Sequence, residues 1–367
     1  MYSQRNLYSK FRFRLSLYEF EDIICQVDSV DLVSPTPTGS FGYRSRIASR
    51  LASTFKTSIN PGVAPAKVTR DYDLFVAVVQ FPKDLLNIEY FKGWKDRCRT
   101  SVCCLNEVWV RDIAQIPYYL HLLSQFDHVF VQLAGSVRPI QDVIKTPCSF
   151  LPTGTDTLLF CPYPDNPARA IDVYSIGRRA QSTHSALQRM AAEDGMFYVY
   201  DTAEGSQVTE AREHRALYAN MAKRSRYFIV NPGKVNATDE TGGQIEFGPR
   251  YFEGAASGTI MLGEIPSNPE FSRFFDWPDA VIHVPFGSDE IAAVVRELDQ
   301  SPEKLEQMRT TNVVQSLLRH DWAHRWEAVL NSVGLKPMPA LLTRKKQLGD
   351  LAATVALGRR DFQTTSF

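Results

Sequence analysis

Short apolar runs rich in β-branched and aromatic residues recur along the chain, with polar or turn-forming segments between them. The clearest runs occupy residues 73–79, 101–105, 128–131, 170–176, 198–200, 227–230 and 259–262. Runs of this length and composition are typical of parallel strands with both faces covered. Apolar positions with helical spacing lie between them, at 113–123 and 214–221. The alternation predicts an α/β fold built on parallel sheets.

Further patterns predict smaller elements outside these runs. Residues 10–18 alternate polar with apolar side chains, which predicts a half-buried strand. The basic face of this strand is expected to be exposed to solvent. Contact with anionic lipid or with an acceptor is the less favoured alternative. Residues 34–42 are turn-rich and predict a surface loop, while 280–286 predict another strand. Ser288 and Ser301 each precede an acidic first turn, as expected where a helix begins.

The length, charge and cysteine content of the chain restrict the class of protein that it can belong to. A chain of 367 residues exceeds the usual size of one domain. Lys+Arg and Asp+Glu are both 41, so no overall charge points to a nucleic-acid partner. The six cysteines show no CxxC pair, and Cys103 and Cys104 lie in an apolar run, so we expect buried free thiols rather than a metal site. No apolar run approaches the ~20 residues of a membrane helix, and no secretory signal is recognisable, so we expect a cytoplasmic protein.

The stretch 242–264 combines a loop, a helix and a buried strand around two carboxylates. Gly242, Gly243 and Gly248 allow the backbone to approach an anion closely. Pro249 suits the first turn of a helix, where its missing N–H costs nothing. Unpaired amides at such a helix start stabilise a diphosphate together with the helix dipole. The pattern predicts a nucleotide-sugar site.

Glu253 falls about one turn into this helix, within reach of ribose hydroxyls. Gly258 is placed to end the helix as a C-terminal cap. The plainer alternative is an ordinary loop, helix and strand with a surface glutamate.

These residues resemble the signature of group 1 glycosyltransferases, especially the branch related to the CgeB spore-maturation proteins. The resemblance rests on Phe247, Gly248, Arg250, Phe252, Glu253, Ala255, Ala256 and Gly258. It implies the GT-B architecture, in which two Rossmann-like doubly wound domains face a cleft. It also implies that Glu253, Arg250 and the three glycines of the loop bind the donor substrate.

The first glutamate of the family's usual pair is displaced in this chain. In the family the second glutamate binds the ribose and the first binds the transferred sugar. At the family's spacing from Glu253 the first position falls on Ile245, and the nearest carboxylate is Glu246. Either the loop is one residue shorter and Glu246 is a catalytic, sugar-binding group, or the first carboxylate is absent.

Glu107 is a second candidate catalytic residue. It lies just beyond the run 101–105, where a parallel strand is predicted to end. Ligands of open α/β sheets collect at such carboxyl ends, which favours an acceptor-side group or a base. A solvated glutamate is an equal alternative.

Two basic positions are candidate diphosphate ligands. Arg178 follows the run 170–176, where the family places a cation, and a guanidinium fork matches phosphate oxygens. The family's lysine a few residues later is missing, and His184 or the pair Arg178 and Arg179 can replace it. Lys223 precedes the run 227–230 and either reaches toward phosphate or, slightly favoured, is an ordinary basic helix end.

His320 and His324 imitate a zinc motif, because His-Asp-x-x-His on one helix places two imidazoles on one face. No third ligand is evident, so metal binding is not favoured. The surrounding segment instead resembles the late helix of the CgeB-like enzymes, with Trp322 and Trp326 on its apolar face.

The resemblance divides the chain into three parts. Residues 1–163 are expected to form an acceptor-side domain, 164–330 a nucleotide-sugar-binding domain, and 331–367 helices that return to the first domain. The expected activity is transfer of a sugar, hexosyl in type, from a nucleoside-diphosphate sugar to an acceptor hydroxyl, with retention of configuration and without metal or cofactor.

The expected partners are the donor and a glycan, lipid-linked or small-molecule acceptor, without nucleic acid. Peripheral contact with the inner face of a membrane is left open. A nucleotide-sugar epimerase or hydrolase is one alternative function. A non-catalytic scaffold of the same fold, suggested by the displaced Glu246, is the other.

Overall fold

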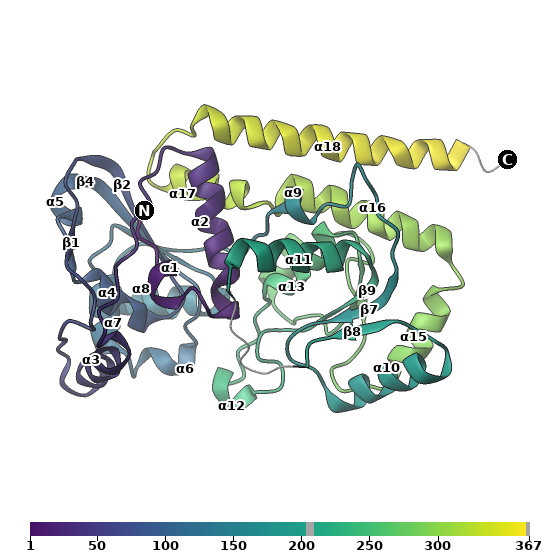
Figure 1. The fold of residues 1–367 in the computed structure, drawn as a ribbon, viewed down its shortest axis with the longest axis horizontal. Coiled ribbons are helices and arrows are strands. Elements are labelled where there is room, and N and C mark those ends of the chain that lie inside the picture. The colour runs from purple at the N-terminus through teal and green to yellow at the C-terminus, as the bar shows by residue number, and fades with distance from the viewer. Residues whose placement is uncertain (203–208, 365–367) are drawn as a thin grey trace.

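Two parallel sheets form the frame of the computed structural model, which describes residues 1–202 and 209–364 (Figure 1). The first sheet has the order β2 (Tyr72–Val79), β4 (Cys98–Leu105), β5 (His128–Val131), β6 (Cys148–Phe150). The second has the order β11 (Ile282–His283), β10 (Ile260–Gly263), β9 (Ser225–Val230), β7 (Ile171–Ser175), β8 (Tyr198–Tyr200). Every neighbouring pair in both sheets is parallel. The predicted α/β fold is confirmed.

The first sheet separates two hydrophobic cores, because successive strand residues point to opposite faces. Phe75, Ala77 and Val79 of β2 contribute to one core, and Val76 and Val78 contribute to the other. The first core is covered by α3 (Phe41–Phe55), α4 (Leu85–Ile88), α7 (Pro117–Leu123) and α8 (Val137–Ile144). The second is covered by α2 (Leu15–Val27), α17 (Trp322–Ser332) and α18 (Pro339–Thr364). Segments from both ends of the chain therefore cover the second face.

The second sheet is also covered on both faces. One face carries α9 (Thr157–Phe160), α11 (Ala211–Lys223), α13 (Pro249–Ala256) and α14 (Pro269–Phe274). The other carries α10 (Gln181–Glu193), α15 (Ile291–Leu298) and α16 (Pro302–Arg319). Because β8 lies outside β7, the strand order reverses between β7 and β9. Ligands of open α/β sheets bind at such a switch point, beyond the carboxyl ends of the strands.

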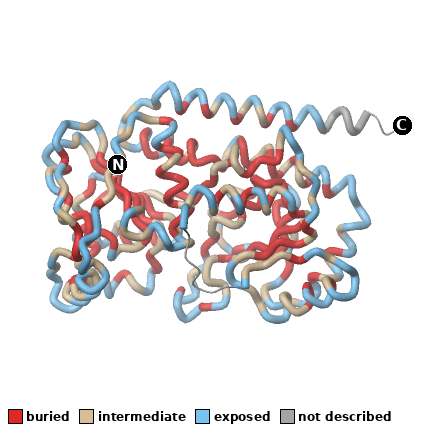
Figure 2. The backbone as a smooth tube through the Cα atoms, in the orientation of Figure 1, coloured by how far each residue is buried: buried red, intermediate tan, exposed pale blue. Residues whose placement is uncertain are grey.

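The last helix, α18, starts above α2 and runs along the side of the second sheet and its helices (Figure 1). We call each sheet with the helices that cover it a unit, the first unit being built on β2, β4, β5 and β6 and the second on β7 to β11. Helix α18 lies along α16, which belongs to the second unit, and also contacts α2 of the first unit. Its inner residues Leu341, Leu348, Ala352 and Val355 are buried, while its outer side is exposed (Figure 2). Contacts between α2 and this part of the chain begin already in α17, before residue 331.

Short elements complete the chain. They are α1 (Arg5–Tyr8), three 3-10 turns (Arg12–Arg14, Pro82–Asp84 and Ala134–Ser136), β1 (Ala66–Lys67), β3 (Phe91–Lys92), α5 (Trp94–Arg97), α6 (Val110–Ile113) and α12 (Thr238–Thr241).

The strand predicted at residues 10–18 is wrong. Residues Arg12–Arg14 form a 3-10 turn, and α2 begins at Leu15. The alternation over a few residues is the start of a longer helical pattern, in which Leu17, Phe20 and Ile24 share a buried face. A short apolar run cannot by itself distinguish a strand from a buried helix.

Three other expectations needed smaller corrections. The predicted helix 113–123 is two helices, because Pro117 begins a new one at α7. The predicted strand 280–286 is reduced to β11. His320 and His324 do not share one helix, because α16 ends before His320 and Asp321 caps the start of α17.

Candidate active site

A cavity of about 230 Å³ lies at the carboxyl ends of β7 and β8, beside the switch point. Three parts of the second unit line it: the loops after these two strands, α11, and the first turns of α13. The first unit contributes the turn before α2 and the start of that helix. The lining residues are Arg12, Phe13, Leu15, Ser16, Ile176, Gly177, Asp201, His214, Arg215, Tyr218, Pro249, Arg250 and Glu253.

The start of α13 faces this cavity without a cap. Gly248 precedes the helix in an extended conformation, Pro249 is its first residue, and no side chain of the described residues caps it. Backbone N–H groups of an uncapped first turn have no intrahelical partner. A Cβ at Gly254 would lie 2.9 Å from Met261 Sδ, so glycine lets α13 pack closely on β10. Gly258, at φ +63°, ends the helix as predicted.

Glu253 is buried at the floor of the cavity and has three donors. Arg215 Nη1 donates to its Oε1 at 2.5 Å, and Arg250 Nη1 donates to its Oε2 at 2.6 Å. The Tyr218 hydroxyl donates to Oε2 at 2.8 Å. Burial alone would raise the pKa of Glu253, but Arg250 and Arg215 outweigh it and lower the pKa to about 2. Glu253 is therefore a carboxylate held by two guanidinium groups.

Arg215 extends this network into the first unit. Its Nε and Nη2 donate to the two oxygens of Glu19 on α2 at 3.0 and 2.9 Å. Glu19 also accepts from Trp322 Nε1 at 2.9 Å and from the Asp156 amide at 3.1 Å. Glu19, Arg215, Glu253 and Arg250 form what we call the ionic chain, in which the first three side chains are buried and Arg250 is partly exposed. It pairs two carboxyl groups with two guanidiniums and joins α2, α11 and α13, and burial raises the pKa of Glu19 to about 7.

Glu246 lies in a second contact between the two units. Its carboxylate accepts the backbone amides of Ala134 and Gly135 at 3.0 and 2.8 Å. It also accepts from Gln244 Nε2 at 2.7 Å and from Asn268 Nδ2 at 3.3 Å. Burial raises the pKa of Glu246, and these hydrogen bonds oppose the rise only in part.

Gln244 and Glu107 complete this contact, which we call the clasp. Gln244 Oε1 accepts the Val110 amide at 2.9 Å. Glu107 Oε1 accepts from Trp109 Nε1 at 2.9 Å and pairs with Lys234 Nζ of the second unit at 3.0 Å. The clasp therefore joins loops at the carboxyl ends of β4 and β5 to the loop before α13. Glu107 and Glu246 both lie in it, and neither lines the cavity around Glu253.

The remaining predicted site residues are dispersed. Arg178 is exposed on the loop after β7, one residue from the cavity wall, and its Nη1 donates to Asn236 Oδ1 at 2.8 Å. Gly242 and Gly243 have positive φ, and a Cβ at Gly242 would lie 3.2 Å from Arg111 Cβ of the first unit. Lys223 is the last residue of α11 and does not line the cavity, which His214, Arg215 and Tyr218 of the same helix do, and burial lowers its pKa.

Sequence reasoning missed several residues at these sites. Arg215 and Tyr218 lie one turn apart on the predicted helix 214–221, and that spacing was the only available signal. Glu19 was missed because residues 10–18 were predicted as a strand, so the helix α2 that carries Glu19 was not recognised. Asp201, at the end of β8, pairs with Arg179 at 2.6 Å and also accepts the Gly177 amide at 3.2 Å, where nothing in the sequence marked it.

Residues 178–331 match the model of a family described as glycosyl transferase-like. The matched segment contains Arg215, Arg250 and Glu253 of the cavity and Gln244 and Glu246 of the clasp. The match supports the resemblance to glycosyltransferases for this segment, and the two parallel sheets covered by helices agree with the two-domain α/β architecture that the resemblance implies. Membership in the CgeB-like branch stays a prediction. No curated protein matches the chain.

Two solved structures are similar in fold at low sequence identity. A trehalose-phosphate synthase (UDP-forming) from Burkholderia vietnamiensis is 9% identical with a TM-score of 0.48, over 89% of this chain and 84% of that one. Anabaena HepE, solved in complex with UDP-glucose, is 10% identical with a TM-score of 0.45, over 91% of this chain and 88% of that one.

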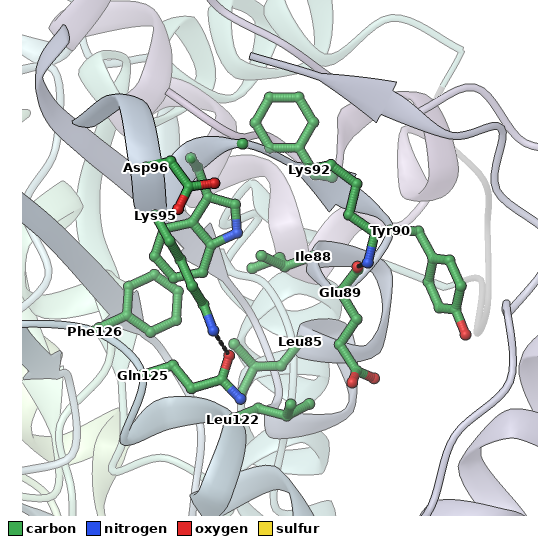
Figure 3. A pocket seen from close by; sticks show the side chains of 13 residues that line it. Leu85, Ile88, Glu89, Tyr90, Lys92, Lys95, Asp96, Leu122, Gln125 and Phe126 are labelled. Carbon is green, nitrogen blue, oxygen red and sulfur yellow. Dashed lines mark hydrogen bonds between the residues drawn. The ribbon is translucent and has the colours of Figure 1, made fainter. Parts of the chain in front are cut away.

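A larger cavity of about 450 Å³ lies elsewhere in the first unit (Figure 3). Trp94 and Phe126 line it and precede β4 and β5, so it lies at the amino ends of these strands. The Lys95 ammonium donates to Gln125 Oε1 at 2.6 Å across it (Figure 3). Because α/β sheets bind ligands at the opposite edge, we do not assign the donor to this cavity.

The described residues contain neither a metal-binding cluster nor a membrane-spanning helix. No group of three or more His, Cys, Asp or Glu side chains in the part of the chain that the structure describes is arranged to hold a metal ion. His320 is buried among aromatic rings, and burial lowers its pKa well below the usual value, so it is neutral. Within residues 1–202 and 209–364, none of the helices is long and apolar enough to cross a membrane.

Proposed function

We propose that the protein transfers a sugar from a nucleoside-diphosphate sugar to an acceptor hydroxyl. The observation that carries the proposal is the match of residues 178–331 to a glycosyl transferase-like family, with Arg250 and Glu253 of that segment lining a cavity at the switch point. The nucleotide part of the donor is assigned to this cavity. The proposed reaction uses the nucleotide sugar as its only donor and no further cofactor.

Three positive groups suit the diphosphate. The uncapped amides of α13 and the Arg250 guanidinium face the cavity, and Arg178 follows Gly177 on its wall. As the bond to the leaving diphosphate breaks, negative charge grows on the phosphate oxygens. Fixed amides and guanidiniums aimed at that charge stabilise the transition state more than the bound donor. Retention of configuration is part of the proposal, and NMR of the anomeric proton in the product tests it.

Glu253 is proposed to act on the donor in two ways. Its oxygens hold Arg250 in position, and the same carboxylate lines the cavity where a ribose hydroxyl would lie. A carboxylate with a pKa of about 2 remains ionised through the whole physiological range, so it can only accept hydrogen bonds. This suits a hydroxyl donor on the nucleotide.

The first test is a thermal unfolding screen with UDP, GDP, ADP, TDP and CMP and their common sugar conjugates. A ligand that binds only the folded state raises the melting temperature. We expect one nucleoside diphosphate to do so selectively and Arg178→Ala to weaken its affinity roughly 10- to 100-fold, as for a lost charged hydrogen bond. Arg138→Ala removes another exposed guanidinium, on α8 and outside the cavity lining, and should leave the affinity unchanged. No shift with any nucleotide at millimolar concentration contradicts the proposal and favours the scaffold alternative.

Replacing Glu246 separates the roles of clasp and cavity. We expect Glu246→Gln to reduce transfer roughly 10- to 100-fold, because a neutral amide accepts the Ala134 and Gly135 amides weakly and the closed cleft is lost. The affinity for the nucleoside diphosphate should stay within about threefold, since Glu246 does not line the cavity. Glu240→Gln, which removes an exposed partner of Lys234, serves as the matched control.

The activity assay of Glu246→Gln also tests the roles assigned to Glu246 and the alternative that the protein is a hydrolase. Unchanged transfer by Glu246→Gln would remove both the clasp role and the sugar-binding role. Release of free sugar at the same rate with and without an acceptor would indicate a hydrolase instead.

A further inference from the structure

A long segment of the first unit lacks carboxylates. Between Asp31 and Asp71 the sequence contains no Asp or Glu and six basic residues, although the whole chain is balanced at 41 and 41. The six are Arg44, Arg46, Arg50, Lys56, Lys67 and Arg70. The positive charge of this segment is therefore local and not a property of the chain.

Helix α3 presents most of this charge to solvent. Ala48 and Ala52 are buried against the first core, and the Tyr119 hydroxyl donates to Ser49 O from α7. The cations on the rest of the helix and at its end are exposed: Arg44, Arg46, Arg50 and Lys56. Among the residues that the structure describes, no carboxylate forms an ion pair with any of these four.

Large apolar side chains lie between these cations. Tyr43 is 72% exposed and Phe55 is 68% exposed, and Ile59 follows just beyond the helix at 38%. In residues 1–202 and 209–358, four of the five exposed large aromatic side chains belong to the first 55 residues. They are Phe11, Phe13, Tyr43 and Phe55, and the fifth is Phe197. Most of the exposed aromatic side chains of the described residues are thus in the N-terminal part of the chain, and two of them, Tyr43 and Phe55, are on α3 with the cations.

A row of aromatic rings joins this surface to the mouth of the cavity. Phe41, at the start of α3, lies 5.8 Å from the Tyr8 ring, and Tyr8 lies 6.1 Å from Phe11. Phe11 lies 5.5 Å from Phe13, which lines the cavity. Both α1 and α3 lie on the first unit in Figure 1, apart from α18. A planar surface bound by α3 would therefore lie beside the entrance to the site.

We propose that α3 docks the protein on an anionic membrane surface. Arginine and lysine are attracted to anionic headgroups, and the two aromatic residues, Tyr43 and Phe55, are of the kind that enters the interface. A helix with cations and apolar rings together fits a lipid interface, whereas a polyanion without bases, such as heparin, needs the cations alone. Docking brings acceptors held in that membrane to the cavity mouth. The docking itself rests on this surface alone, and only the supply of acceptors to the cavity rests on the proposed function.

Vesicle sedimentation tests the proposal with the full chain. We expect binding to phosphatidylcholine vesicles that contain phosphatidylglycerol, no binding to phosphatidylcholine alone, and weakening as salt rises. The triple variant Arg44→Ala, Arg46→Ala, Arg50→Ala should lower the vesicle affinity roughly a hundredfold. The control variant Arg138→Ala, Arg189→Ala, Arg273→Ala removes equal charge from exposed positions on α8, α10 and α14 and should bind as the wild type does.

A second variant separates lipid from other polyanions. Tyr43→Ser with Phe55→Ser keeps every cation, so it should weaken vesicle binding while any binding to heparin stays unchanged. Equal loss in the two triple variants overturns the proposal, as does equal binding to vesicles with and without phosphatidylglycerol. Tight binding to heparin or single-stranded nucleic acid without vesicle binding overturns it in favour of a soluble polyanion. These side chains are exposed, so all variants should keep the wild-type melting temperature.

Discussion

Glu253→Gln is expected to lower the free energy of unfolding by about 2 to 3 kcal/mol, less than for breaking a fully buried ion pair from one side, because water partly solvates the Arg250 side chain, which is 34% exposed. Glu253 is the only carboxylate that Arg250 pairs with among the described residues, so the neutral amide leaves the Arg250 charge without a counter-ion. Arg215 keeps its bonds to Glu19. Urea unfolding followed by circular dichroism measures the loss.

A matched control and a pH series make this result specific. Glu270→Gln removes the partner of Arg273, a largely exposed guanidinium, and should cost less than about 1 kcal/mol. The folded-state pKa of Glu253, about 2, lies below its ordinary value of 4.5, so its contribution is present above pH 4.5 and lost as pH falls toward 2. Wild type and Glu253→Gln should therefore approach each other in stability over that acid range. A constant difference across it would contradict the ionised state that we assign to Glu253.

Trp322→Ala is expected to cost about 3 to 5 kcal/mol, the range for truncating a buried tryptophan. The Trp322 side chain is fully buried, stacks on Phe20 of α2 with ring centroids 4.7 Å apart, and donates to Glu19. A Cβ at Gly154 would lie 2.9 Å from its ring, so the site is closely packed and cannot collapse easily. Chemical denaturation of the purified variant measures the effect.

Trp322→Phe divides this cost into packing and hydrogen bonding. The phenyl ring keeps part of the contact with Phe20 but cannot donate to Glu19, so we expect a loss of about 2 kcal/mol, typical of a hydrogen bond to a charged group. If Trp322→Phe and Trp322→Ala are equally unstable, the packing against α2 contributes little and the prediction is wrong.

The strands were predictable because a parallel strand covered on both faces is a continuous apolar run. The runs 73–79, 101–105 and 128–131 correspond to β2, β4 and β5 for this reason. The strand prediction failed at residues 10–18. This segment is too short to distinguish the two-residue period of a strand from the 3.6-residue period of a helix. Only the later residues of α2, up to Val27, reveal the helical period.

The candidate site was predictable where its residues are consecutive in the chain. The uncapped start of α13, with Arg250 and Glu253 one turn apart, follows from the local sequence 248–258. The partners of Glu253 did not follow, because Arg215 and Glu19 come from distant segments that only tertiary packing brings together. The same limit applies to Glu246, whose contacts with Ala134 and Gly135 join residues more than a hundred positions apart.

The second core of the first sheet has a consequence for how the chain folds during synthesis. β2, β4 and β5 leave the ribosome early, but α17, which covers one of their faces, is made only after the whole second unit. Until then Val76, Val102 and Phe130 have an incomplete cover, and exposed apolar strands of this kind favour aggregation. We therefore expect that the first unit cannot complete its folding co-translationally, before the second unit is made. Its second core is closed only when the segment that begins at Trp322 has been synthesised.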